Sequence, residues 1–292
     1  MHTEMWEHPA VTENLETLRR RGVHLVAPEA GRLAGGDVGA GRLAAPDVIV
    51  AAALDLLRGG RGATGDLAGV KLVVTAGGTR EPIDPVRFLG NRSSGKMGHA
   101  IAQQAAIRGA DVTLVTTASA GIPSGVDVVR VETAQQMADA VLAVAPSAAV
   151  VVMAAAVADF RPVSAADSKL KKAAGIPEIV LERTPDILAA LGAAKPAGQV
   201  LVGFAAETGD VRANAQSKLE AKQVDLMVAN DVTAPGAGFE VDTNRAVLLD
   251  SAGRVDEQPL MSKAALADVI LDRIAQTRAS GPEESVRKKE HQ

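Results

Sequence analysis

Residues 71–109 read KLVVTAGGTREPIDPVRFLGNRSSGKMGHAIAQQAAIRG. The run KLVVTA at its start is apolar and rich in β-branched residues, as in a buried strand, and KMGHAIAQQAAIRG at its end has the spacing of an amphipathic helix. A long insert separates them and ends in the glycine-rich octamer NRSSGKMG (91–98). A strand, a glycine-rich loop and a helix in this order predict a βα unit whose loop binds an anion.

The alternation of strand and helix continues along the chain. We expect strands at 111–117, 126–132, 148–155, 199–206 and 225–230, and helices at 96–109, 133–145, from about 185, at 210–223 and at 262–279. A hairpin is expected around AVLLD (246–250) and the turn SAGR. Repeated βα units predict an α/β fold with a Rossmann-like, mostly parallel sheet, helices on both faces and a β-hairpin extension. Ligands bind such sheets at the carboxyl ends of the strands.

Composition divides the chain into three segments. Residues 1–66 contain the glycine-rich stretch GRLAGGDVGAGRLAAPD (31–47) and end in GGRGATGD (59–66), which predicts a linker. Residues 67–279 carry the βα units. The segment 280–292 is charged and has no apolar face, so we expect a disordered tail.

Charge and composition exclude several classes of function. The net charge is −4 and aromatic residues make up 2% of the chain, so neither the basic surface nor the stacking residues of a nucleic-acid-binding protein are expected. The chain has no cysteine, which excludes disulfides, thiolate catalysis and cysteine-based zinc sites. The first residues, MHTEMWEHPA, do not resemble a secretory signal, and we expect a cytoplasmic protein.

One apolar stretch could be either a membrane-spanning segment or part of the protein core. VLAVAPSAAVVVMAAAVA (141–158) is almost uncharged and long enough to be weighed as a membrane span. Pro146 and Ser147 interrupt it, and alanine dominates it. We therefore expect a helix end, a turn and a buried parallel strand, with no membrane partner.

The octamer and the insert bring cations to one place. Ser93, Ser94 and Gly95 precede or open a helix, where backbone N–H groups and the helix dipole favour an anion. The insert adds three arginines and an amide, namely Arg80, Arg87, Arg92 and Asn91. Arginine suits bidentate binding of carboxylate or phosphate. We assign a functional role to Arg87 beside Asn91, and a solvated position to Arg80 and Arg92.

Further cations follow other predicted strands. MAAAVADFRP (153–162) delivers Asp159 and Arg161 to the ligand edge, and SKLKK adds Lys169, Lys171 and Lys172. Lys218 and Lys222 are four residues apart on a predicted helix and share one face. A dinucleotide site would need G-x-G-x-x-G and an acidic residue after the second strand, and both are missing. The cations therefore predict a polyanionic ligand such as a nucleoside triphosphate.

At this point the chain resembles a known family. TAGGTREPIDPVRFLGNRSSGKMG, AAAVADFRP, SKLKK, VGFAAET (202–208) and ANDVTAPGAGFEVDTN (229–244) resemble phosphopantothenate–cysteine ligase, the synthetase half of the bacterial bifunctional coenzyme A biosynthesis protein. The resemblance covers roughly residues 69–278 in five ordered motifs. It implies a reaction in two steps: CTP and 4′-phosphopantothenate form an acyl-cytidylate and pyrophosphate, and L-cysteine then displaces CMP. It also implies that Mg²⁺ assists the reaction. Finally, it implies that the ligase is a homodimer that uses the hairpin region.

The resemblance also implies the site residues. Asn91 and Arg87 resemble the pair that binds the intermediate and serves its conversion with cysteine, and Lys169 resembles the lysine needed to form the acyl-cytidylate. The residues that resemble the CTP site are Met153, Ala154, Ala155, Asp159, Lys169, Pro185, Asp186, Ile187, Leu188, Phe204, Lys218 and Lys222, with Ser93, Ser94 and Gly95 against the phosphates. Phe204 can stack on a base. Metal ligands are not identified, because phosphates and water can hold Mg²⁺.

The first residues resemble a different enzyme. HTEMWEHP (2–9) and GRLAGGDVGAGRL (31–43) are similar to the end of the flavin-dependent phosphopantothenoylcysteine decarboxylase, with His2 where many relatives have Asn and Gly35 where many carry a proton-donating Cys. We expect no FMN binding by this chain. Two alternatives to the ligase remain: a fragment of a bifunctional enzyme that also decarboxylates the product with FMN when a preceding domain is present, and a non-catalytic nucleotide-binding domain with Rossmann-like topology.

Overall fold

The computed structural model describes residues 1–33, 35–36, 38–46, 48–50, 52–53, 65–119, 121–171, 177–207, 211–231, 238 and 241–280. The chain forms two compact units, Met1–Ala63 and Thr64–Gln292, and each is described below by itself. The predicted tail beyond residue 280, most of the predicted linker and Lys172 lie outside the described residues.

The described residues of the first unit include two helices and one strand pair. The helices are α1 (Thr3–Trp6) and α2 (Pro9–Arg20), and the antiparallel strands are β1 (Glu29–Arg32) and β2 (Val38–Arg42). His8 caps α2 by accepting a hydrogen bond from the backbone N–H of Ala10, while proline at the first helical position needs no such partner. The glycine-rich stretch thus forms a strand pair within this unit.

The second unit contains a sheet of eight strands in the described residues, ordered β14-β13-β12-β11-β8-β3-β6-β7. The strands β7, β6, β3, β8, β11 and β12 are parallel, and β13 and β14 continue the sheet as an antiparallel hairpin. Their bounds are β3 (Lys71–Ala76), β6 (Asp111–Thr116), β7 (Asp127–Arg130), β8 (Val150–Met153), β11 (Val200–Glu207), β12 (Leu226–Asp231), β13 (Thr243–Asp250) and β14 (Val255–Ser262). The predicted α/β fold and its hairpin extension are confirmed.

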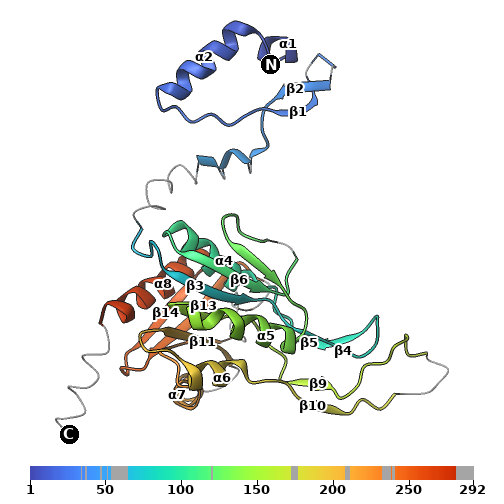
Figure 1. The fold of residues 1–292 in the computed structure, drawn as a ribbon, viewed down its shortest axis with the longest axis vertical. Coiled ribbons are helices and arrows are strands. Elements are labelled where there is room, and N and C mark those ends of the chain that lie inside the picture. Colours follow the sequence, from blue (N-terminus) through green and yellow to red (C-terminus); the bar gives the residue numbers. More distant parts are fainter. Residues whose placement is uncertain are drawn as a thin grey trace. The chain divides into compact units, whose positions relative to one another are not determined.

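Helices cover both faces of this sheet (Figure 1). α4 (Lys96–Ile107) and α8 (Lys263–Ser280) pack on one face, and α5 (Ala134–Val144), α6 (Ile187–Ala194) and α7 (Val211–Ala221) pack on the other. Successive strand residues alternate between the two faces, so Val74 belongs to the core under α4 and Val73 to the core under α5. Because both faces are covered, the central strands are continuously apolar, as the sequence predicted.

The stretch 141–158 is part of this core. α5 ends at Val144, a 3₁₀ turn covers Ala145–Ser147, and β8 follows with every residue buried. The prediction of a helix end, a turn and a strand is therefore confirmed. Within the described parts of the chain, no helix has both the length and the apolar character to cross a membrane.

Two short hairpin-like pairs were not predicted. β4 (Arg80–Pro82) pairs with β5 (Phe88–Gly90) inside the insert, and β9 (Phe160–Pro162) pairs with β10 (Leu181–Arg183) after the central strand. β4 and β9 are in contact, and both pairs extend from the same side of the second unit (Figure 1). Arg80 stacks over Phe88 at 5.1 Å from the ring centroid, so it makes a cation–π contact in addition to facing solvent.

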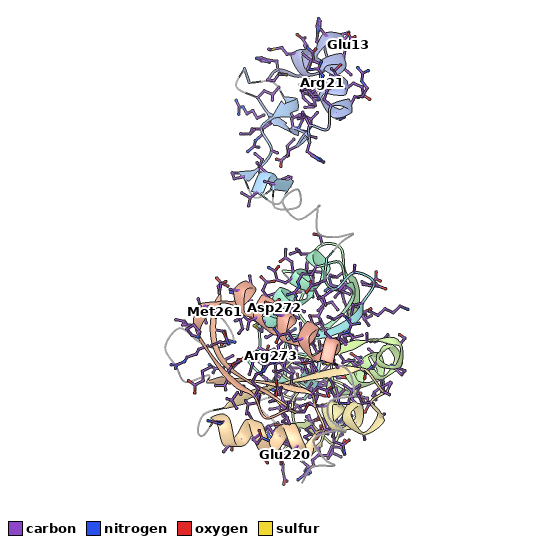
Figure 2. All side chains as sticks on the ribbon, turned by 90° about the vertical axis from the view of Figure 1, so that its left-hand side faces the viewer. Glu13, Arg21, Glu220, Met261, Asp272 and Arg273 are labelled. Carbon is purple, nitrogen blue, oxygen red and sulfur yellow. The ribbon has the colours of Figure 1, made fainter. Side chains whose placement is uncertain are left out.

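The last helix is fixed to the hairpin beside it by buried charges. The guanidinium of Arg273 on α8 donates to Asp250 at the end of β13, at 3.1 Å, and pairs with Asp256 on β14. Figure 2 labels Arg273 and its neighbour Asp272, which pairs with Arg108 at 2.8 Å. These pairs join the middle of α8 to β13, to β14 and to the end of α4.

Candidate functional site

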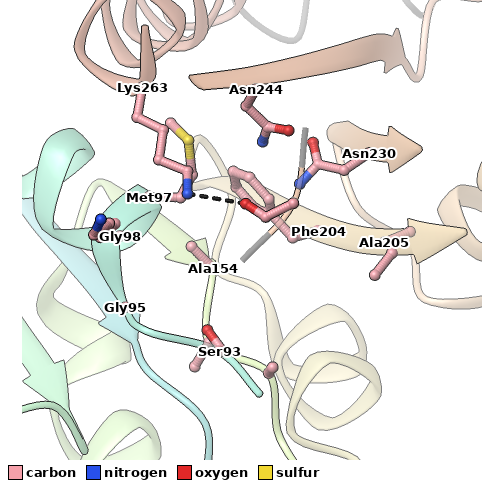
Figure 3. Close-up of a pocket in the computed structure, with 15 residues that line it drawn as sticks. Ser93, Gly95, Met97, Gly98, Ala154, Phe204, Ala205, Asn230, Asn244 and Lys263 are labelled. Atoms are coloured by element: carbon pink, nitrogen blue, oxygen red, sulfur yellow. Dashed lines mark hydrogen bonds between the residues drawn. The ribbon is translucent and has the colours of Figure 1, made fainter. Parts of the chain in front are cut away.

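A pocket lies at the carboxyl ends of β8, β11 and β12, beside the first turns of α4 and α8 (Figure 3). This is the edge of the sheet at which parallel α/β folds bind ligands. Its lining consists of Ser93, Gly95, Lys96, Met97, Gly98, Ala154, Ala155, Ala156, Phe204, Ala205, Ala206, Asn230, Gly238, Asn244 and Lys263.

Glycines allow the octamer to bring α4 close to the sheet. Gly95, the N-cap residue of α4, has a φ of 81°, a conformation that favours glycine. A Cβ at Gly98 would lie 2.6 Å from both the Cβ of Ala76 and the carbonyl oxygen of Thr75. Gly95 has no side chain to cap the helix, and Gly95, Lys96, Met97 and Gly98 line the pocket, so the first N–H groups of α4 are potential donors to an anion there.

Hydroxyl groups hold the backbone that follows β8. The backbone N–H of Ala155 donates to Thr75 Oγ1 at 3.0 Å, and that of Ala158 donates to Thr79 Oγ1 at 2.9 Å. Asn91 reaches the same segment from the insert: its Nδ2 donates to the carbonyl oxygens of Ala156 at 3.3 Å and of Val157 at 3.2 Å. The structure therefore brings Asn91 to the rim of the pocket.

A buried carboxylate joins Arg87 to the segment that carries Lys169. Asp84 accepts from the backbone N–H groups of Val86 and Arg87, both at 2.8 Å, and from that of Leu170 at 3.1 Å. The guanidinium of Arg87 donates to Asp84 at 2.6 Å and to the carbonyl oxygen of Leu170 at 3.2 Å. Burial opposes ionisation of Asp84, but these hydrogen bonds outweigh it and lower its pKa to about 2. Lys169 itself is exposed, next to this cluster.

A second group of predicted residues lies at the start of α6 and the end of α7. Asp186 caps α6 by accepting from the N–H of Ala189 at 3.0 Å, and its other oxygen pairs with Lys222. Burial opposes ionisation of Asp186, yet the hydrogen bonds from Lys222 and Ala189 lower its pKa. α7 ends at Ala221, so the prediction that Lys222 lies on this helix is wrong by one residue, although its N–H still bonds to the carbonyl oxygen of Lys218 at 3.0 Å.

The predicted nucleotide residues thus approach the sheet edge from both faces. Ala154, Ala155, Phe204, Ser93 and Gly95 line the pocket. Phe204 packs against the core beneath α4 and α8, whereas Met153, Ile187 and Leu188 belong to the core beneath α5 and α6. The remaining predicted residues lie outside the pocket lining: Asp159 and Pro185 in the segments before β9 and α6, Lys218 on α7, and Ser94 beside Ser93 in the octamer.

Four polar residues of the pocket were not predicted individually. Asn230 and Asn244 lie in the quoted motif 229–244, Lys96 lies in the octamer, and Lys263 begins α8. The Lys263 side chain is buried, and burial, followed by the nearby charge of Lys96, lowers its pKa. Three of the four residues lie in motifs that the sequence analysis quoted, but the sequence does not show that all four line one pocket. Their proximity results from the fold, which brings distant segments together.

The described residues contain no group of three or more His, Asp or Glu side chains that could hold a metal ion. Phosphate oxygens and water are the usual ligands of Mg²⁺ at nucleotide sites.

Comparisons with known families match both parts of the chain. Residues 67–277 match the family described as DNA/pantothenate metabolism flavoprotein C-terminal domain. Residues 1–58 match the family described as flavoprotein.

Individual relatives agree with these matches. The chain is 52% identical to coenzyme A biosynthesis bifunctional protein CoaBC of Mycobacterium tuberculosis over 286 residues, which cover 94% of this chain and 68% of that protein. The crystal structure of the C-terminal domain of a CoaBC protein is 40% identical, with a TM-score of 0.64, over 74% of this chain and 100% of that one. A Cab2 mutant in complex with phosphopantothenate-cysteine, 16% identical with a TM-score of 0.58 over 78% of this chain and 94% of that one, shares the fold.

Proposed function

The chain belongs to the DNA/pantothenate metabolism flavoprotein C-terminal domain family, and on this premise we propose that it is a CTP-dependent phosphopantothenate–cysteine ligase of coenzyme A biosynthesis. The substrates are 4′-phosphopantothenate, CTP and L-cysteine, and the products are 4′-phosphopantothenoyl-L-cysteine, CMP and pyrophosphate. One observation carries the proposal: Asn91, which comes from the insert, donates hydrogen bonds to the backbone that follows β8 at the rim of the pocket.

In the first step, the carboxylate of 4′-phosphopantothenate attacks the α-phosphorus of CTP, and pyrophosphate leaves with its electron pair. The substrate is itself the nucleophile, so the protein needs to orient the two anions and stabilise the charge that develops. We assign the exposed ammonium of Lys169 to the leaving pyrophosphate and the N–H groups at the start of α4 to the phosphates. Mg²⁺ supplies further charge neutralisation and is expected on phosphate oxygens and water.

In the second step, the amine of L-cysteine attacks the acyl carbon of the cytidylate, and CMP leaves. We assign Asn91 and Arg87 to this step. The amide of Asn91 donates to two backbone carbonyls, and Arg87 is held by Asp84, so both side chains are preorganised. Preorganised donors lower the reorganisation that a reaction requires.

The base of CTP is assigned to the pocket. Phe204 offers an aromatic face, and the backbone at residues 153–155 offers N–H and carbonyl groups that can distinguish the edge of cytosine. On the other side of the sheet edge, Pro185–Leu188, Lys218 and Lys222 complete the proposed nucleotide site, to which we also assign Asp159.

The sequence predicted that the hairpin β13–β14 serves dimerisation. We propose instead that the enzyme is a homodimer in the cytoplasm whose interface is formed by the two hairpin-like pairs β4–β5 and β9–β10. They expose a set of large apolar side chains, namely Val86, Phe88, Phe160, Val163, Val180 and Leu181. Clustered apolar side chains that face solvent mark interaction surfaces. The same pairs carry Arg87 and border Lys169, so a partner docked there would enclose both. Light scattering should give twice the mass of the chain, and a monomer at working concentration would refute the dimer.

The test of the function is a coupling assay on the purified chain. Pyrophosphate release should require CTP, 4′-phosphopantothenate and Mg²⁺, and CMP release should additionally require L-cysteine. A chain that binds CTP but releases no pyrophosphate would support the non-catalytic alternative instead.

The match of residues 1–58 to the flavoprotein family favours a second activity in a longer protein. In that case the ligase product would be decarboxylated with FMN by a domain to which these residues contribute. For the chain itself we expect no bound FMN, and a stoichiometric flavin absorbance band in the purified protein would contradict this expectation.

A further inference from the structure

The backbone segment 154–158, which follows β8, leads from the pocket to the insert. Ala154, Ala155 and Ala156 line the pocket (Figure 3), and the segment continues through Val157 to Ala158, which is buried. In the proposed function, the beginning of this segment is assigned to the base of CTP, and its later carbonyl groups accept the hydrogen bonds of the insert's asparagine. The position of the segment therefore matters for both halves of the reaction.

Two threonines hold the two ends of this segment separately. Thr75 Oγ1 accepts a hydrogen bond from the backbone N–H of Ala155 at 3.0 Å. Thr79 Oγ1 accepts one from the backbone N–H of Ala158 at 2.9 Å. Both threonine side chains are fully buried, and buried backbone N–H groups are almost always paired in folded proteins. Each hydroxyl thus satisfies one N–H group that the sheet no longer pairs.

Thr79 makes a second contact with the same segment. Its backbone N–H donates to the carbonyl oxygen of Ala156 at 3.3 Å. Asn91 Nδ2 donates to that carbonyl oxygen, also at 3.3 Å, and to the carbonyl oxygen of Val157 at 3.2 Å. Both acceptors of Asn91 therefore lie on the short piece of backbone between the two contacts of Thr79.

Two glycines before Thr79 let the backbone of Asn91 approach the same place. Gly77 has a φ of 90°, a conformation that favours glycine. A Cβ at Gly78 would lie 2.5 Å from the carbonyl oxygen of Asn91. Thr117 Oγ1 donates to the carbonyl oxygen of Gly78 at 2.9 Å and fixes this residue to the end of β6. The segment 77–79 therefore contacts Asn91 on one side and the acceptors of its side chain on the other.

The hydrogen bonds of Asn91 make its orientation sensitive to this arrangement. At 3.2 and 3.3 Å, both bonds lie at the long end of the usual range for N–H···O contacts. A further displacement of the carbonyl oxygens would break them. Loss of the Thr79 hydroxyl would leave the buried N–H of Ala158 without its acceptor, a costly state that the segment can relieve only by moving.

We propose that Thr79 is a positioning residue for the second step of the reaction, and that it acts through Asn91. This inference rests on the proposed function, in which Asn91 serves the attack of L-cysteine on the acyl-cytidylate. Thr79 binds no substrate group; it holds the carbonyl oxygens of Ala156 and Val157 where the amide of Asn91 can donate to them. Since Thr75 holds the beginning of the segment independently, the first step should depend little on Thr79.

Thr79→Val tests the role of the hydroxyl, because valine has nearly the same shape and keeps the backbone N–H. In single turnovers of the full chain, CMP release should slow roughly 3- to 10-fold, the usual effect of losing one buried hydrogen bond, while pyrophosphate release keeps the wild-type rate. Thr79→Ser retains the hydroxyl and should restore CMP release. The matched control is Thr133→Val, which removes the cap of α5, a hydrogen bond from the N–H of Gln136 at 3.2 Å. It should lower stability and leave the ratio of the two rates unchanged.

A double variant distinguishes action through Asn91 from a general structural role. If Thr79 works by orienting Asn91, Thr79→Val combined with Asn91→Ala should slow CMP release no more than Asn91→Ala alone. Independent effects would instead multiply, because residues that do not interact contribute additively to the free energy of activation. Multiplied effects, or equal slowing of pyrophosphate and CMP release by Thr79→Val, would overturn the inference.

The outcomes also separate this inference from the proposed function. If wild type couples the substrates and Thr79→Val shows the wild-type ratio of the two rates, the inference fails while the function stands. If wild type releases neither pyrophosphate nor CMP, the function fails, and the inference fails with it. Should Thr79→Val not fold, Thr79→Ala removes the same hydroxyl without adding an apolar group, and the same assay decides.

Discussion

Replacing Asn91 by Asp should slow the cysteine step more than the cytidylate step. In the structure, Asn91 Nδ2 donates to the carbonyl oxygens of Ala156 and Val157, at 3.3 and 3.2 Å. A carboxylate at this position cannot donate and would instead place its negative charge against two carbonyl dipoles. The side chain would therefore turn away from the pocket rim, where we assign it to the conversion of the intermediate.

The magnitude follows from the hydrogen bonds that are lost. A neutral hydrogen bond contributes about 0.5–1.5 kcal/mol, and since both bonds here are long, their joint loss should correspond to roughly 1–2 kcal/mol. If this loss falls on the second step, CMP release should slow by about 5- to 30-fold. Lower pH should restore part of the rate, because the protonated carboxyl can donate to one carbonyl, and neighbouring dipoles raise the pKa of such a group. Asn91→Ala should show no recovery of this kind.

Single-turnover measurements decide the matter. Pyrophosphate and CMP are quantified from the same reaction, and the acyl-cytidylate is detected by mass spectrometry. Asn91→Asp should release close to one equivalent of pyrophosphate and accumulate the intermediate. Asn14→Asp, at an exposed position on α2 of the first unit, makes the same chemical change at a residue that does not line the pocket, and it should behave as wild type. Equal slowing of pyrophosphate and CMP release by Asn91→Asp would refute the assignment.

Three further predictions concern other parts of the second unit. Lys169→Gln should slow pyrophosphate release, and an unchanged rate in a stopped-flow phosphate assay with pyrophosphatase would remove Lys169 from the first step. Asp186→Ala should lower stability by about 1 kcal/mol through the lost helix cap. Because the folded-state pKa of Asp186 lies below its ordinary value of 3.8, this difference should be complete at neutral pH and shrink as the pH falls through the lowered pKa; thermal melts across that range test it. Arg273→Met should cost roughly 3–5 kcal/mol in urea unfolding, because it leaves Asp250 buried with less compensation, whereas Arg278→Met near the end of the same helix should cost little.

The architecture of the second unit could be predicted because its signals are local. KLVVTA and the residues of β8 are apolar on both strand faces, which only a covered parallel strand explains, and Thr133 marks the start of α5 with a capping box. The strand pairs β4–β5 and β9–β10 carry no such signal, because each strand has three residues. Tertiary contacts fix them: the N–H of Arg80 donates to the carbonyl oxygen of Glu132 at 2.9 Å, for example.

The pocket was predictable where one segment carries several of its residues. Ser93 and Gly95 could be predicted from the helix start that they precede, whereas Ala154 and Ala155 were predicted through the family resemblance; all four line the pocket. Lys263 was not predictable as a pocket residue. Its position depends on how α8 returns across the sheet after the β13–β14 hairpin, and a lysine at a helix start is normally solvated.

Asp84 shows how the unpredicted strand pairs serve the predicted residues. The insert presents Arg87, and the segment after β9 presents Lys169 one residue before Leu170. The carboxylate of Asp84 accepts hydrogen bonds from the guanidinium of Arg87 and from the backbone N–H of Leu170. With a pKa of about 2, that carboxylate remains ionised at every pH at which the enzyme is expected to act. Arg87 and the Lys169 segment are therefore held together by a residue with no assigned contact to substrate, which explains why an insert that breaks the usual strand–loop–helix order can still serve a site at the sheet edge.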